Sequence, residues 1–223
     1  MSFFDRYINS KLYHYTDIFF KMILLNVLMI TTTILGLVVF GLPLSLLVGS
    51  ISLRIILKKT SVNVFEVYFK TLKSVVKKTI KPVVVFSFIL MILGFNSVYF
   101  YFGLEPFDWF YFISFSLMVF LFVFSLVSYI HGLFLSVLYD LNVKSLLKHS
   151  YLLTIGFIVR SLLLLLIGFV YTYTLILIPI LGIIIGLSGF SLLILVTLVS
   201  GYKRIQTLDE ALDEEVKKIL ESA

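Results

Sequence analysis

One apolar stretch, IFFKMILLNVLMITTTILGLVVFGLPLSLLVGSISLRIIL, runs from Ile18 to Leu57 and decides the fold. As a single helix, its 40 residues would be about 60 Å long, roughly twice the hydrocarbon thickness of a bilayer. Glycine and proline interrupt helices, and Gly41-Leu42-Pro43 lies inside this stretch. We therefore expect two membrane spans joined by a tight turn, near 19–41 and 43–57.

The overall composition also indicates an integral membrane protein. Of the 223 residues, 61% are hydrophobic and 13% are charged, and the mean hydropathy is +1.12. Soluble domains contain about 45–50% apolar and about 25% charged residues. The chain has no cysteine, which excludes disulfides and thiolate chemistry, and we expect neither a cofactor nor a bound metal. The first apolar run is longer than the core of a signal peptide, so no cleavable leader is expected.

Three later apolar runs extend the membrane pattern. A span needs about 20 apolar residues, and the last run is long enough for two spans separated near Pro179. The predicted fold is an all-α, polytopic transmembrane helical bundle of about six spans, forming a single membrane domain over 1–223. The later spans are expected near 82–102, 109–138, 160–178 and 180–202.

The positions of the basic residues predict the orientation of these spans. With six spans and a cytoplasmic N-terminus, all 18 Lys and Arg residues fall on inner segments, while the outer loop GLEPFD carries Glu105 and Asp108. Basic residues are enriched in cytoplasmic loops. We therefore expect a multi-pass protein of the bacterial plasma membrane with both termini in the cytoplasm. Five spans remain possible if 43–57 is a re-entrant segment.

A lysine-rich segment separates the second and third predicted spans. Asn63 followed by Glu66 is a capping-box-like start, and the spacing predicts an amphipathic inner helix over 63–81. Such a helix can anchor on anionic lipid or bind a cytoplasmic partner. Nucleic acid is not expected, because the aromatic residues share the apolar stripe and both helix ends lead into the bilayer. The lysine face comprises Lys70, Lys73, Lys77, Lys78 and Lys81, and the apolar stripe comprises Phe65, Tyr68, Phe69, Leu72, Val75, Val76 and Ile80.

Two residues are candidates for a polar site inside the membrane. Arg160 is the only charge well inside an apolar stretch, so it is either part of a substrate or proton pathway or a boundary residue whose side chain reaches the surface. The boundary interpretation is favoured, because it gives both final spans a sensible length. His131, near the inner end of the fourth span, is either a ligand or relay or a hydrogen-bonded histidine of the bundle.

Small and neutral polar residues indicate how the helices pack. Gly182, Gly186 and Gly189 form a small-residue face that lets another helix approach, within the chain or in an oligomer. Hydroxyl and amide side chains in the spans are expected to tie helices together and not to bind a substrate; they are Asn26, Thr31, Thr32, Thr33, Asn96 and Ser97.

The C-terminal segment over 207–221 predicts a short cytoplasmic helix. It begins with a capping box from Thr207 to Glu210, and its acids precede its lysines, as the helix dipole favours. This helix could pair with the basic inner helix or with a partner.

The sequence lacks the motifs of common enzyme classes. There is no phosphate-binding loop, no HExxH and no GxSxG, so we expect a protein that is not an enzyme. There is also no EAA-type loop, with which permeases of ABC importers bind their ATPase.

Two stretches, LLNVLMITTTILGLVVFGLPLSLLVGSISLRII and VFEVYFKTLKSVVKKTIKP, resemble the YesL family of bacterial membrane proteins. The later stretch LLKHSYLLTIGFIVRSLLLLL resembles the second inner helix of that family. Because genes of the family often neighbour carbohydrate ABC importers, the resemblance implies an accessory role in sugar uptake, with the permease or the ATPase subunits as partners. It defines no functional residues. The alternatives are a small stand-alone transporter or channel lined by His131 and Arg160, and a lipid-surface sensor acting through 63–81.

Overall fold

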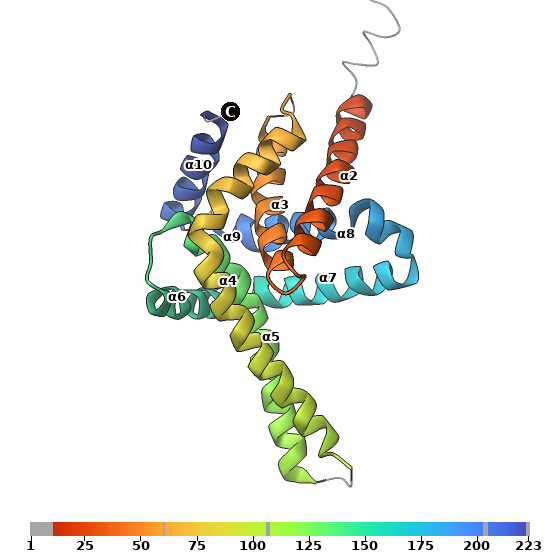
Figure 1. The fold of residues 1–223 in the computed structure, drawn as a ribbon, viewed down its shortest axis with the longest axis vertical. Coiled ribbons are helices and arrows are strands. Elements are labelled where there is room, and N and C mark those ends of the chain that lie inside the picture. Colours follow the sequence, from red (N-terminus) through yellow and green to blue (C-terminus); the bar gives the residue numbers. More distant parts are fainter. Residues whose placement is uncertain (1–10, 60, 106–107, 203–204, 222–223) are drawn as a thin grey trace, which may run out of the picture. The chain divides into compact units, whose positions relative to one another are not determined.

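The computed structural model describes residues 11–59, 61–105, 108–202 and 205–221, and every regular element in these ranges is a helix (Figure 1). The all-α prediction is therefore confirmed. The contacts divide the chain into two compact units, where the hydropathy pattern predicts one domain: unit 1 comprises residues 1–76 and 162–223, and unit 2 comprises residues 77–161. Arg6, Lys203 and Arg204, which the orientation prediction includes, lie outside the described residues.

Within the described ranges, six helices are long and apolar enough to cross a membrane, as predicted. The chain is thus a multi-pass integral membrane protein. The spans are α2 (Lys11–Leu35), α3 (Gly41–Lys58), α4 (Val64–Phe102), α5 (Trp109–Leu138), α7 (Ile158–Leu177) and α8 (Pro179–Ile194), the last extended by the π-helical η1 (Leu195–Val199) and by α9 (Ser200–Tyr202). Two further helices, α6 (Val143–Gly156) and α10 (Gln206–Glu221), are not among these spans.

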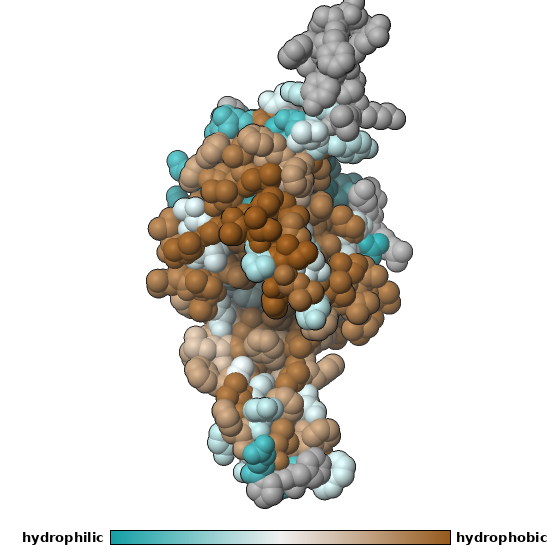
Figure 2. Space-filling model, turned by 90° about the vertical axis from the view of Figure 1, so that its right-hand side faces the viewer, coloured by the Kyte–Doolittle hydropathy of each residue, from teal (hydrophilic) through white to brown (hydrophobic). Residues whose placement is uncertain are grey.

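Large apolar side chains cover much of the surface that the protein exposes. Brown, hydrophobic residues occupy most of the face drawn in Figure 2. Leu35, Phe102 and Phe169 have exposed fractions of 79%, 76% and 72%. Apolar patches of this extent are rare on soluble monomers, whereas lipid chains cover them in a bilayer.

Helix α3 is the core of unit 1. It packs against α2 and α8, and its side chains are buried on several sides. The beginning of α2, the end of α3 and α10 lie at the same end of this unit (Figure 1). The buried apolar residues of α3 are Leu47, Val48, Ile51, Leu53, Ile55 and Ile56.

The turn between α2 and α3 comes earlier than predicted. Helix α2 ends at Leu35, and Gly41, which the sequence places in the turn, is already the first residue of α3. Gly36 and Gly41 approach so closely that a Cβ at either would meet backbone atoms of the other side of the turn. Between them Leu37 and Val38 have φ values of 56° and 58°, a left-handed conformation that costs L-residues roughly 1–2 kcal/mol each. Close packing of the two backbones fixes the turn at these residues.

The predicted inner helix over 63–81 and the predicted span over 82–102 form one continuous helix, α4. Pro82, predicted at the first position of a span, lies inside this helix. A proline removes one backbone hydrogen bond, but the helix can continue through it where packing holds the flanking turns. Pro82 and Val83 are both buried, so packing holds α4 together at this point. The predicted N-terminal cap is present, since the backbone N–H of Phe65 donates to Oδ1 of Asn63 at 3.0 Å.

Unit 2 consists of α4 from Lys77 onward, α5, α6 and the first residues of α7. Aromatic contacts join α4 to α5, among them Tyr101 with Phe115 at a ring separation of 5.8 Å. Asp108 caps α5 and Asn142 caps α6, each by accepting a backbone N–H at 2.8 Å. These caps place the start of both helices.

The close approach at the α2–α3 turn predicts the effect of a single methyl group. Gly41→Ala should lower the thermal midpoint of the purified protein in detergent, with a loss of about 1–3 kcal/mol, because the new Cβ overlaps backbone atoms of Thr33 that cannot rotate away. Gly94→Ala is the matched control, because its Cβ would meet only Phe122 at 3.6 Å. Circular dichroism melts of both variants measure the difference, and equal midpoints would contradict this account of the turn.

Candidate functional site

The predicted lysine face of α4 contains three kinds of lysine. Lys70 pairs with Glu66 at 2.7 Å, one turn earlier on the same helix. The ammonium of Lys78 donates to the backbone carbonyl of Val137 at 3.2 Å, at the end of α5. The side chains of Lys73, Lys77 and Lys81 are exposed.

The apolar stripe predicted on the same segment is divided between two environments. Tyr68 and Val75 are buried in unit 1, and the Tyr68 hydroxyl donates to Oγ1 of Thr32 at 2.8 Å. Phe65 and Phe69 have exposed fractions of 49% and 56%. This part of α4 therefore packs into the protein on one face and exposes aromatic rings and lysines on others.

His131 and Arg160 lie in unit 2, in different surroundings. His131 is fully buried, and its ring stacks on Phe157 at 6.3 Å, one helical turn before Arg160. Hydroxyl groups close to it in sequence link α5 to α6, with Oγ of Ser128 and Oγ1 of Thr154 at 2.9 Å. Arg160 is only partly buried and lies in the first turn of α7. His131 is thus part of a packed helix interface, whereas Arg160 is near a helix start.

The three predicted packing glycines of α8 differ in their contacts. A Cβ at Gly189 would collide with the ring and hydroxyl of Tyr171, whereas one at Gly186 would only touch Leu175 at 3.8 Å and one at Gly182 would meet nothing within 4 Å. The Tyr171 hydroxyl donates to the carbonyls of Ile185 and Gly186 at 2.8 and 3.0 Å. Gly189 therefore serves the packing of α7 on α8 within the chain.

Asn26 of α2 makes the most extensive polar contact within the spans. Its amide nitrogen donates to the carbonyls of Gly182 and Ile183 at 3.2 and 2.6 Å, and its amide oxygen accepts the N–H groups of Leu187 and Ser188 at 2.7 and 3.1 Å. The side chain is fully buried. It thus binds four backbone groups of α8 and fixes α2 against that helix, in the role that the sequence indicates.

A charged cluster joins the end of α3 to α10, a pairing that was not predicted from the sequence. The Arg54 guanidinium donates to Asp209 at 2.8 Å and to Asp213 at 2.7 Å, and Lys58 contacts Asp213 at 2.6 Å. The Arg54 side chain is only 13% exposed. Below we call Arg54, Lys58, Asp209 and Asp213 the ionic clasp.

Apolar packing and a second polar contact complete the docking of α10. Ser74 of α4 donates to Glu215 at 3.2 Å. Full burial of such apolar side chains is worth about 1.5–3 kcal/mol each, against about 1.5–3 kcal/mol for hydrogen bonds to charged groups, a value that the exposure of Asp213 reduces here. Packing therefore supplies most of the affinity, and the ionic clasp sets the position of the helix. The buried apolar residues of α10 are Leu208, Leu212, Val216 and Ile219.

The spacing of Asp209 and Asp213 is the signal from which the ionic clasp could be inferred. Residues four apart share one helix face, so both carboxylates can reach one cation. The partner lies 155 residues away in sequence, and local periodicity does not identify it. Among the residues that the structure describes, no group of three His, Cys, Asp or Glu is arranged to hold a metal ion.

Loss of the arginine should loosen α10 without unfolding the spans. Arg54→Gln leaves two carboxylates without their shared cation, and hydrogen bonds to charged groups contribute about 1.5–3 kcal/mol, reduced here by the exposure of Asp213. Amide hydrogen exchange in α10 should accelerate about tenfold, for a loss of about 1.4 kcal/mol. Lys217→Gln, at a lysine whose side chain is 76% exposed, is the control. Unchanged exchange in Arg54→Gln would show that the ionic clasp does not hold α10.

The same cluster makes the attachment of α10 sensitive to acid. Partial burial would raise the pKa of Asp213, but hydrogen bonds from Lys58 and Arg54 outweigh it and hold that pKa below its ordinary value. A carboxylate with a lowered folded-state pKa stabilises above its unfolded pKa, and this contribution is lost as the pH falls through the folded value. Protease cleavage within α10 should therefore speed up below the ordinary carboxyl range, and Asp213→Asn should weaken that pH dependence. If the cleavage rate depends on pH in the same way in the wild-type protein and in Asp213→Asn, Asp213 is not the group that makes the attachment of α10 sensitive to acid.

No protein-family model, no curated protein and no solved structure matches this chain. The resemblance to the YesL family accordingly stays an interpretation of the sequence.

Proposed function

We propose that this integral membrane protein is a non-enzymatic accessory component that associates with a carbohydrate ABC importer of the bacterial plasma membrane. In this proposal both termini are cytoplasmic and the first half of α4 faces the cytoplasm. The role in sugar import is inferred from the resemblance of the sequence to the YesL family. The orientation of the spans in the membrane is inferred from the positions of the lysines in the sequence.

The observation that carries the proposal is the exposed face at the beginning of α4. Phe65 and Phe69 expose about half of their side chains beside the exposed Lys73, while Tyr68 and Val75 of the same turns are fixed in the core of unit 1. An aromatic and basic surface on a helix that is already anchored loses little entropy on binding a partner. Aromatic residues are also enriched at protein interfaces, and basic ones complement an acidic partner surface.

A stand-alone transporter or channel is the second candidate, favoured by the backbone of α8. Side chains from other helices, Asn26 and Tyr171, bind backbone groups of α8, which then continues into the π-helical residues Leu195–Val199. Transporter sites often use irregular helices in the middle of the bilayer, and π-helical turns are frequent at functional sites.

Purification from native membranes in mild detergent separates the two functions. An accessory component should carry importer permease or ATPase subunits in stoichiometric amounts, and the double variant Phe69→Ser with Lys73→Gln should lose them. The control variant Lys217→Gln, which changes an exposed charge on α10, should keep them. If wild-type protein carries no importer subunit and moves solute alone in liposomes, the accessory function is wrong and the transporter is right.

A further inference from the structure

In unit 2, the charged residues of α4 end close to the place where the apolar residues of α5 end. On α4 the lysines end at Lys81, and residues 83–102 contain no charged residue. Helix α5 contains no Asp, Glu, Lys or Arg and is followed closely by Asp140. The hydrogen bond from Lys78 to the carbonyl of Val137 brings the two boundaries together. In a bilayer, such a boundary lies where lipid headgroups meet the hydrocarbon region.

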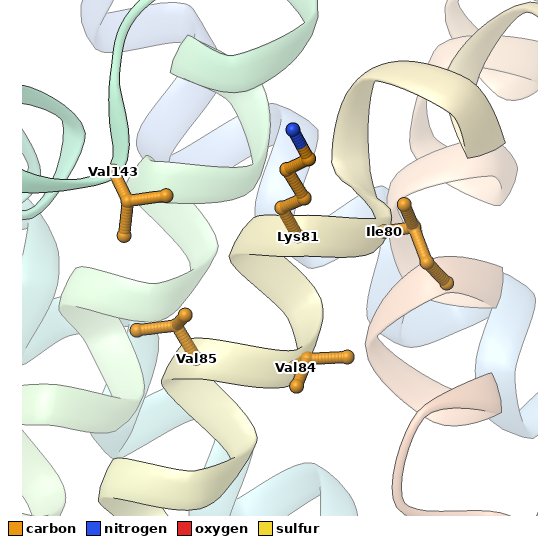
Figure 3. A pocket seen from close by; sticks show the side chains of 5 residues that line it. All are labelled: Ile80, Lys81, Val84, Val85 and Val143. Carbon is orange, nitrogen blue, oxygen red and sulfur yellow. The ribbon is translucent and has the colours of Figure 1, made fainter.

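A groove of about 390 Å³ opens at this level between α4 and the start of α6. Its walls are the apolar side chains of Ile80, Val84, Val85 and Val143, and its one charged lining residue is Lys81 (Figure 3). Ile80 and Val84 are each 48% exposed, so the groove is accessible from outside. The Lys81 side chain extends away from Val84 and Val85, which leaves a cation at one end and hydrocarbon walls at the other (Figure 3).

We propose that this groove binds one anionic phospholipid, with its phosphate on Lys81 and an acyl chain along Val84 and Val85. Charge near the groove favours an anionic ligand, since the exposed Lys77 precedes Lys81 by one helical turn and the exposed Lys144 follows Val143, while Asp140 is the one acid in the connection between α5 and α6. Among the described residues, none of the ion pairs involves Lys81. The ammonium is therefore available to a headgroup phosphate. The valine side chains can contact an acyl chain, which the hydrophobic effect keeps out of water.

This site does not depend on the proposed accessory function. It predicts a fixed, selective lipid contact in place of general attraction to a charged membrane. A general attraction of anionic lipid is shared among all exposed lysines, so the loss of any one of them should have a similar effect. A specific site should instead lose its lipid when Lys81 in particular is replaced.

Quenching by brominated lipid measures occupancy of the groove directly. Val84→Trp places an indole on the groove wall, and Trp109→Phe removes the chain's single native tryptophan. The full-length protein is reconstituted in phosphatidylcholine vesicles with rising fractions of dibrominated phosphatidylglycerol or, in parallel, dibrominated phosphatidylcholine. Quenching by the anionic lipid should reach half its maximum at an about fivefold lower fraction, the preference that one lysine at the headgroup level supplies.

Charge variants in the same background distinguish a site from a surface. Lys81→Gln should abolish the preference and Lys81→Arg should retain it, which separates loss of charge from loss of fold. Lys148→Gln removes an exposed lysine of α6 that does not line the groove and should keep the preference. Equal quenching by both lipids, equal effects of Lys81→Gln and Lys148→Gln, or absence of quenching, as when another helix fills the groove, would each overturn the proposal.

Discussion

The structure depends on one constraint: a polar atom inside an apolar surrounding must find its partner within the chain. An unpaired backbone or side-chain group there costs several kcal/mol, which is why the spans are helices. Many hydroxyl side chains follow the same rule and donate to carbonyls of their own helix, as Thr31 does to Val27 at 2.9 Å and Ser97 does to Leu93 at 2.8 Å, whereas the buried Oγ of Ser52 is an exception. Where a side chain reaches another helix, as Asn26 does, the same requirement ties two spans together.

Among the described residues, the burial of a charged group decides how the constraint affects it. Arg54 is mostly buried at the end of α3, and two carboxylates of α10 accept its hydrogen bonds. The lysines of α4 are less buried and keep their ammonium groups at the surface or, in the case of Lys78, on the carbonyl at the end of α5. The depth of each cation therefore decides whether it holds the protein together or faces the surroundings.

Hydropathy predicted the number of spans because the free energy of transferring each apolar residue from water to lipid adds to that of its neighbours and depends little on distant parts of the chain. It placed four of the six span starts within about one helical turn, because a fixed bilayer thickness and a rise of 1.5 Å per residue set the length of each span. It failed at α4, because the amphipathic pattern of 63–81 continues in phase into the span, and at the α2–α3 turn, because Gly36 and Gly41 act as a pair. The contacts of Arg54 with α10 and of Asn26 with α8 join residues more than 150 positions apart, and no local pattern specifies them.

The hydrogen bonds of Asn26 bear on the choice between the two proposed functions. A carboxamide has two N–H donors and two acceptor lone pairs, and Asn26 uses all four on the backbone of α8. A substrate could bind this amide only by displacing one of those backbone groups, which would then be left unpaired in an apolar surrounding at a cost of about 1–3 kcal/mol. A transporter that used Asn26 would therefore need a second arrangement of α8, whereas an accessory component needs only the one seen. The same reasoning favours function at exposed surfaces such as the face of Phe65 and Phe69, where binding breaks no existing internal hydrogen bond.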